Sequence, residues 1–102
     1  MLELRPICEH CARQLPPHST EARICSFECT FCRACAEGVF MNVCPNCGGG
    51  FERRPVRPQG NHRSNNNLEN YPAISSEKHK PKNIDEHRSW AKAVSLIPPG
   101  DR

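Results

Sequence analysis

The sequence predicts a small α+β domain in its first half, followed by a mostly disordered tail. Residues 1 to about 52 hold all eight cysteines, all four phenylalanines and most of the large aliphatic side chains. The second half is rich in Asn, Pro, Lys, Arg, His and Ser. A core drawn from about 50 residues rarely buries enough apolar surface to fold alone, so we expect disulfides or bound metal to add stability. We place the Cys-rich domain at 1–57 and the tail at 58–102.

We interpret the cysteines as metal ligands rather than disulfide partners. Eight cysteines also fit a disulfide framework, but disulfides need an oxidising compartment. The N-terminal MLELRPIC lacks the apolar region and the small-residue cleavage site of a signal peptide. No stretch approaches the ~18 apolar residues of a membrane span. We therefore expect a cytoplasmic protein with no membrane contact, whose clustered, reduced thiols bind metal.

The spacing of the cysteines indicates the metal. They form four pairs, Cys8 with Cys11, Cys25 with Cys29, Cys32 with Cys35, and Cys44 with Cys47. Two residues lie between the members of each pair except Cys25 and Cys29, which are separated by three. The two-residue spacing makes a tight turn that directs both sulfurs at one ion, about 2.3 Å from each. Four thiolates around each of two Zn²⁺ ions use all eight thiols and leave no position for water. We therefore expect two structural zinc ions per chain and no enzyme.

Two assignments of the pairs to the two ions are plausible. In the sequential assignment, the first ion takes Cys8, Cys11, Cys25 and Cys29, and the second takes the rest. In the crossed assignment, site 1 consists of Cys8, Cys11, Cys32 and Cys35. Site 2 then consists of Cys25, Cys29, Cys44 and Cys47.

Local structure favours the crossed assignment. Residues 22–25 and 29–31 suit two short strands with a turn between them, which is a β-hairpin. The run CRACAEGVFMN at 32–42 predicts a helix, with Cys32 and Cys35 on one face of its first turn. A two-thiol turn, a hairpin and a helix that supplies two ligands from its first turn form a treble clef. That arrangement joins the first pair of cysteines to the third and leaves the second pair for the fourth.

The spacing over residues 8–47 also resembles a RING-type cross-brace. The phrase CTFCRAC at 29–35 and the proline directly after the seventh ligand, Pro45, strengthen the resemblance. Cys29 stands where most RING domains have His. The resemblance implies a RING-like fold with crossed zinc sites.

Residues 1 to about 58 resemble, more closely, a small bacterial Cys-rich family called domain of unknown function 1272. The matching segments are MLELRPIC at 1–8, Pro17, STEARICSFECTFC at 19–32 and CPNCGG at 44–49. The resemblance implies a bacterial, cytoplasmic zinc-binding protein and indicates no reaction.

We expect a non-enzymatic module for protein interaction, or an adaptor. The expected contact surface is a groove lined by His10, Val39, Met41 and Pro45. One alternative is a zinc-linked nucleic-acid binder that uses Arg53, Arg54 and Arg57, and another is a redox-responsive regulator. A ubiquitin ligase is less favoured, because His10 replaces the aliphatic residue that is usual at this position. Two tetrathiolate zinc sites would bring the net charge of residues 1–50 from −1 to about −5, which argues against a nucleic-acid-binding core.

The apolar side chains of the first half predict a small core, made of Leu4, Ile7, Leu15, Ile24, Phe27, Phe31, Phe40 and Val43. In the tail, Asn83 and Glu86 resemble a capping box, and a short helix is predicted at 84–97. Its apolar stripe would be Trp90, Ala93, Val94 and Ile97. This helix is either transient within the disordered tail or docked on the zinc domain or on a partner.

Overall fold

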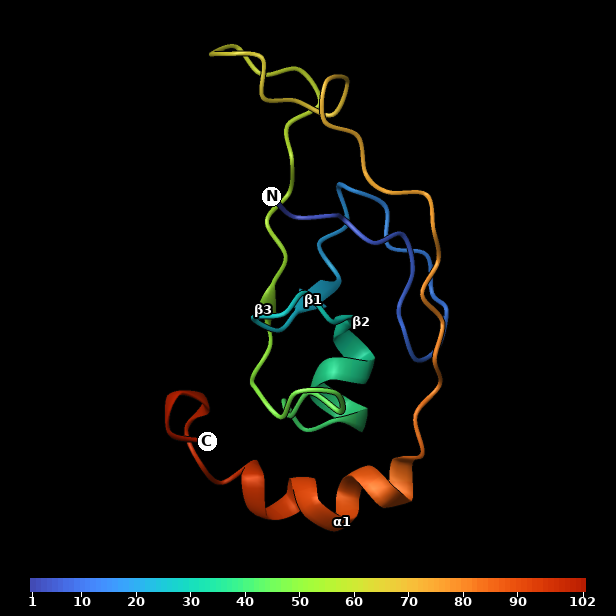
Figure 1. The fold of residues 1–102 in the computed structure, drawn as a ribbon, viewed down its shortest axis with the longest axis vertical. Coiled ribbons are helices and arrows are strands. Elements are labelled where there is room, and N and C mark those ends of the chain that lie inside the picture. The colour runs from blue at the N-terminus through green and yellow to red at the C-terminus, as the bar shows by residue number, and fades with distance from the viewer.

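Three short antiparallel strands form a sheet beside a short helix, and a long C-terminal segment runs around them (Figure 1). The computed structural model describes all residues, 1–102. The strands are β1 (Ala22–Ile24), β2 (Thr30–Cys32) and β3 (Glu52–Arg53), in the order β2-β1-β3. The helices are η1 (Ala34–Val39), α1 (Ile84–Val94) and a single turn, η2 (Pro99–Asp101). None of these helices has both the length and the apolar character needed to cross a bilayer.

The predicted hairpin is confirmed as β1 and β2. Ile24 pairs with Thr30, so two β-branched residues face each other next to the turn. Within the turn, the Glu28 N–H donates to the Cys25 carbonyl oxygen at 3.0 Å, and Glu28 adopts a φ of 63°. The turn therefore closes tightly and brings both ends of the hairpin to the same side.

The predicted helix after Cys32 is present but shorter than expected. η1 is a helix of the π type, in which the Phe40 N–H donates to the carbonyl oxygen of Cys35, five residues earlier. Met41 and Asn42 both have positive φ, at 51° and 58°, so the chain turns out of the helix there. The result is one wide turn that carries Cys35 and Ala36 into the interior.

Aromatic packing forms the centre of the core. The Phe31 ring lies edge-on to Phe40 at 5.0 Å and to Phe51 at 5.4 Å, centroid to centroid. Of the predicted core, six residues are buried: Leu4, Ile7, Leu15, Phe31, Phe40 and Val43. Ile24 is half-buried, and Phe51 is a core residue that the prediction omitted.

The placement of Phe27 in the core was wrong. Its side chain is 73% exposed, because the residue sits in the hairpin turn rather than on the inner face of a strand. The neighbouring inward position belongs to Cys25, which is buried. The Phe27 N–H donates to the Cys25 sulfur at 3.4 Å, so the backbone faces the interior while the ring faces solvent.

The expectation of a disordered tail was also wrong. The N–H groups of Ile74 and Lys80 donate to the carbonyl oxygens of Glu3 and Glu9, at 3.0 and 2.8 Å. The Lys82 N–H donates to Nδ1 of His10 at 2.9 Å. Few apolar residues are involved, and a judgement from composition therefore missed the order that these hydrogen bonds provide.

The predicted tail helix exists as α1, and it docks on the domain. Asn83 caps it, with its Oδ1 accepting from the Glu86 N–H at 3.0 Å. His87 is 3% exposed, and its Nε2–H donates to the Val43 carbonyl oxygen at 2.8 Å. The His87 ring also contacts Phe40 edge-on, with the ring centroids 5.0 Å apart. The buried face of α1 thus consists of His87 and Ala91. Trp90 and Ala93, which the sequence placed in the apolar stripe, are exposed.

Replacement of His87 by Ala should detach α1. The change removes a buried hydrogen bond and leaves the Val43 carbonyl oxygen unpaired, which costs about 1–3 kcal/mol. We expect the amide of Ser95, which donates to the Ala91 carbonyl oxygen within the helix, to exchange faster with solvent. Native-state hydrogen exchange measures this. Arg88→Ala, on the exposed side of α1, is the matched control; equal protection in the two variants would contradict the docking.

Candidate metal centres

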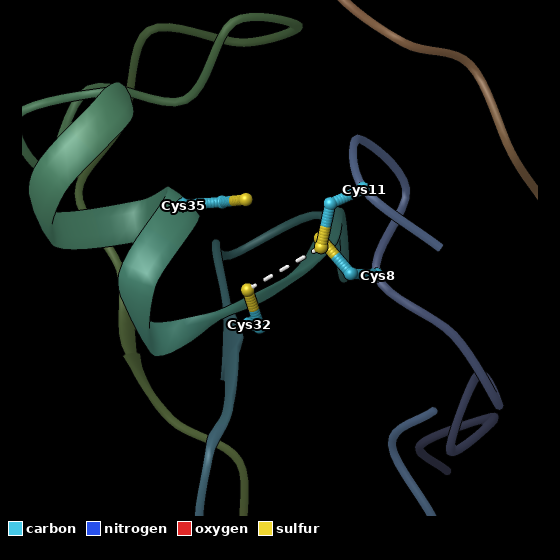
Figure 2. Close-up of side chains that lie close together, drawn as sticks. All are labelled: Cys8, Cys11, Cys32 and Cys35. Carbon is cyan, nitrogen blue, oxygen red and sulfur yellow. Dashed lines mark hydrogen bonds between the residues drawn. The ribbon is translucent and has the colours of Figure 1, made fainter. Parts of the chain in front are cut away.

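Four thiols from two separate segments of the chain, 8–11 and 32–35, meet beside the sheet. This first cluster comprises Cys8, Cys11, Cys32 and Cys35, whose sulfur atoms all lie within 4.8 Å of one another (Figure 2). The sulfurs of Cys11 and Cys32 are 3.7 Å apart. Sulfurs in a tetrahedral zinc site, about 2.3 Å from the ion, are about 3.8 Å from each other. The first cluster therefore has the dimensions of a tetrathiolate zinc site.

Local backbone geometry presents these thiols. Two backbone hydrogen bonds of Cys8 close the turn at 8–12. Its N–H donates to the carbonyl oxygen of Arg13 at 2.8 Å, and its carbonyl oxygen accepts from the Ala12 N–H at 3.0 Å. Ala12 adopts a φ of 63°, which reverses the chain after the pair of ligands. Cys32 is the last residue of β2, and Cys35 follows in the first turn of η1. The hairpin thus places Cys32 and Cys35 next to the turn that carries Cys8 and Cys11.

A second cluster, Cys25, Cys44 and Cys47, lies at the other end of β1. These three sulfurs are also within 4.8 Å of one another. In the 44–49 turn the Gly48 N–H donates to the Cys44 carbonyl oxygen at 2.8 Å. Gly48 has a φ of +81°, a conformation that side chains other than Gly rarely adopt. Gly48 therefore allows the chain to leave the turn after Cys47.

Cys29 is outside this cluster but adjacent to it. Its carbonyl oxygen accepts from the Cys25 N–H at 3.2 Å, and its thiol is half-exposed. The structure thus brings together all four thiols of predicted site 1 and three of the four of predicted site 2, with Cys29 beside them. Ligation of a metal by these thiols stays a prediction.

The environment of the thiols disfavours their charged form when no cation is present. Burial raises the pKa of the Cys25 thiol to about 11, and the neighbouring thiols of Cys29 and Cys47 contribute. Burial likewise raises the pKa of Cys35 and of Cys44. At neutral pH these thiols are protonated when no cation is near, because their thiolates would be desolvated and close to further thiols. A divalent ion reverses this preference by displacing the protons.

A polar network that sequence reasoning missed links the two turns. Glu9 lies between Cys8 and Cys11, and Asn46 lies between Cys44 and Cys47. Asn46 Nδ2 donates to Glu9 Oε1 at 2.9 Å, while Lys82 Nζ donates to Glu9 Oε1 at 3.1 Å and to Asn46 Oδ1 at 2.9 Å. The polar residues inside both CxxC turns could have indicated this network from the sequence. Lys82 could not have been predicted as a member, because it comes from the tail.

His10 is a contact residue of the tail rather than a member of either cluster. Burial lowers its pKa, and the charges of Lys82 and His79 add to the effect. Its Nδ1 is therefore free of a proton and accepts the Lys82 N–H. The ring packs edge-on against Phe40, with centroids 5.1 Å apart. The side chain is half-buried beneath the tail.

Comparison with known proteins agrees with the sequence resemblance. The family described as "Protein of unknown function (DUF1272)" matches residues 1–57. An uncharacterized protein of Rhizobium meliloti (strain 1021) is 49% identical over 89 residues, which is 87% of this chain and 99% of the relative. That match is longer than the family segment, so the similarity extends into the tail. No solved structure matches. The chain therefore belongs to the DUF1272 family of proteins of unknown function.

Proposed function

We propose that the protein is a non-enzymatic, two-zinc module with a RING-like cross-brace, which acts by binding another protein in the cytoplasm. The observation that carries the proposal is the order in which the chain visits the clusters. It contributes to the first cluster at 8–11, to the second at 25, to the first again at 32–35, and to the second again at 44–47. Alternation of this kind is the defining feature of a cross-brace.

The donor set supports zinc as the metal. Cys8, Cys11, Cys32 and Cys35 would hold one ion, and Cys25, Cys29, Cys44 and Cys47 the other. Thiolate sulfur is a preferred ligand of Zn²⁺, and four thiolates form a closed structural site. Such an ion supplies folding free energy and offers no position for a substrate. The hairpin ends at Cys32 and is followed by η1, which carries Cys35, and this order agrees with a treble clef around the first ion.

The groove expected from sequence to bind a partner is covered by the chain's own tail. His10 accepts a hydrogen bond from Lys82. Pro45 lines a small cavity together with Lys82, His87 and Trp90. A partner would have to displace α1 to reach this face. We therefore assign the contact to a different surface.

Phe27 is the residue that we assign to the partner contact. Its ring is 73% exposed on a turn whose two ends are Cys25 and Cys29. Metal ligation would fix both ends, so the exposed ring would be held in one position. Rigid, exposed aromatic side chains are typical anchors of protein interfaces, because they bury a large area with little loss of entropy.

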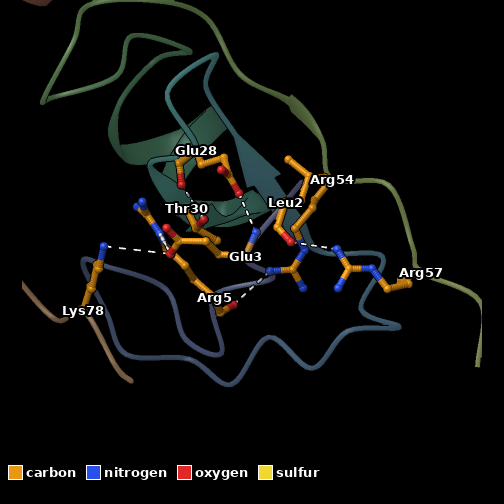
Figure 3. Close-up of polar contacts among 8 residues, drawn as sticks. All are labelled: Leu2, Glu3, Arg5, Glu28, Thr30, Arg54, Arg57 and Lys78. Atoms are coloured by element: carbon orange, nitrogen blue, oxygen red, sulfur yellow. Dashed lines mark hydrogen bonds and ion pairs between the residues drawn. The ribbon is translucent and has the colours of Figure 1, made fainter. Parts of the chain in front are cut away.

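The arginines proposed for nucleic-acid binding have other roles in the structure. Arg54 is 1% exposed and donates to the carbonyl oxygen of Arg5 at 2.9 Å (Figure 3). It also donates to the carbonyl oxygens of Leu15 and Pro16, at 3.2 and 3.0 Å. Arg57 donates to the carbonyl oxygens of Leu2 and Tyr71. Both guanidinium groups therefore fasten the domain together, and only Arg53 of the three is exposed without such contacts. This is why we favour a protein partner over a nucleic acid.

The zinc content of variants tests the crossed sites. Purified, reduced protein should contain two zinc ions. Cys8→Ser combined with Cys32→Ser should leave one, because both changes fall in the first cluster. Cys8→Ser combined with Cys25→Ser should damage both sites. Elemental analysis measures the zinc content; a sequential assignment would instead leave one zinc in the Cys8/Cys25 protein.

Removal of zinc should unfold the domain. Binding of a structural zinc ion contributes on the order of 10 kcal/mol, and a chain this short has few other sources of stability. With a chelator at neutral pH, we expect the amide signals of Ile24 and Phe31 to collapse into the range of an unfolded chain, and to recover when zinc is returned. NMR measures both. Dispersed signals in the metal-free protein would show that the aromatic core suffices.

Replacement of Phe27 by Ala should weaken partner capture and leave the fold intact. The exposed ring contributes little to stability, so the zinc content and the melting temperature should stay the same. Capture of partners from an extract of the native host, quantified by mass spectrometry, should fall at least about tenfold, as for an interface anchor worth more than 1.4 kcal/mol. Leu96→Ala, which removes an exposed apolar residue from the tail, is the control. Unchanged capture with Phe27→Ala would exclude this surface.

A further inference from the structure

The two clusters differ in how completely their thiols converge. In the first, four sulfur atoms lie within 4.8 Å of one another; in the second, only three do. The fourth predicted ligand of the second site, Cys29, is half-exposed and contacts the Cys25 thiol, but it does not lie within this distance of all three other thiols. An ion in the second site would thus be held by three converged thiols and by one that is less completely enclosed.

The second cluster also has a route for an incoming ligand. The exposed thiol of Cys47 lines a cavity of about 330 Å³, whose opposite wall is formed by Trp90, Val94 and Ile97. No cavity of the molecule is lined by a thiol of the first cluster. A cavity of this size admits a small molecule, because a single water occupies about 30 Å³.

The C-terminal segment forms one side of this cavity. Arg102 donates to the carbonyl oxygens of Asn42 and Gly48, at 2.9 and 3.1 Å. Pro99 packs so closely on Gly50 that a Cβ on this glycine would lie 2.9 Å from its Cγ. These contacts join the end of the chain to the turn that carries Cys44 and Cys47. Residues 97–102 therefore border the approach to Cys47 through this cavity and restrain the turn that carries it.

We infer that the second site is an exchangeable zinc site, with Cys29 as its detachable ligand and the C-terminal segment as its cover, while the first site retains its zinc. The inference rests on the proposed binding of zinc at both sites. In the exchange, a thiolate from a small thiol forms a bond to the ion as the bond to Cys29 breaks, and Cys29 takes up a proton. No electron is transferred, so no oxidant is required.

The rates of zinc transfer to a chromogenic chelator, 4-(2-pyridylazo)resorcinol, test the inference on the full chain. In the presence of reduced glutathione as the small thiolate, we expect two phases of one zinc each. The fast phase should be at least about tenfold faster than the slow one, equivalent to a barrier lower by about 1.4 kcal/mol. Release of both ions at one rate would overturn the inference.

Two pairs of variants assign the phases. Cys29→Ser should still purify with two zinc ions and release one of them about tenfold faster than the native chain. Cys11→Ser, which removes the exposed thiol of the first cluster, should lose the slow phase. Arg102→Ala should accelerate the fast phase alone, whereas Arg88→Ala, on the exposed side of α1, should change neither phase.

The outcomes separate this inference from the proposed function. A native protein that purifies without zinc refutes the proposed function. A native protein with two zinc ions, of which Cys29→Ser loses one completely, overturns the exchangeable site alone. An unchanged fast phase in Arg102→Ala overturns the role of the cover.

Discussion

Convergence of thiols that lie far apart in the sequence is the constraint on which the rest of the structure depends. Cys8 must reach Cys32, and Cys25 must reach Cys44, so the N-terminal turn and the hairpin fold back on each other. Five of the 15 buried apolar residues are themselves cysteines. The ligand set is therefore also much of the core. Since buried thiols repel one another once ionised, a cation between them would offset that repulsion, as the proposed zinc ions would.

The tail forms a second layer whose net charge is opposite in sign to that of the first. A zinc-loaded domain is acidic, and residues 51–102 carry a net charge of +4. Lys82 reaches Glu9 between the two metal-binding turns at 3.1 Å, and Lys78 approaches Glu3 at 3.9 Å. The Lys82–Glu9 ion pair is the more consequential one, because both of its side chains are largely buried, whereas the pair of Lys78 and Glu3 is solvated. These polar contacts hold the tail and α1 over the groove, where His10 and Pro45 would otherwise be exposed.

The elements closest to the thiols were the most predictable, because ligand geometry leaves them few alternatives. The hairpin and the helix that carries Cys35 followed from spacing and local chemistry, although the helix is shorter than predicted. The cap at Asn83, in the tail, followed from local chemistry alone. Phe27 was misplaced because hydropathy alone does not reveal that a turn residue must face outward when its neighbour is a buried ligand. The order of the tail was missed because it depends on hydrogen bonds to backbone groups of Glu3 and Glu9, which no pattern in the tail encodes. Arg54 was misjudged for the same reason, since its partners are three carbonyl groups.

The alternation of the clusters along the chain has a consequence for synthesis. A nascent chain emerges from its N-terminus, so Cys25 and Cys29 leave the ribosome before Cys32 and Cys35 do. At that moment the first four cysteines are the only complete set of four thiols, and they are divided between the two clusters. If both clusters bind zinc, as proposed, an ion captured then would span the two final sites. It would have to exchange ligands before the native arrangement could form, when the hairpin closes and η1 folds.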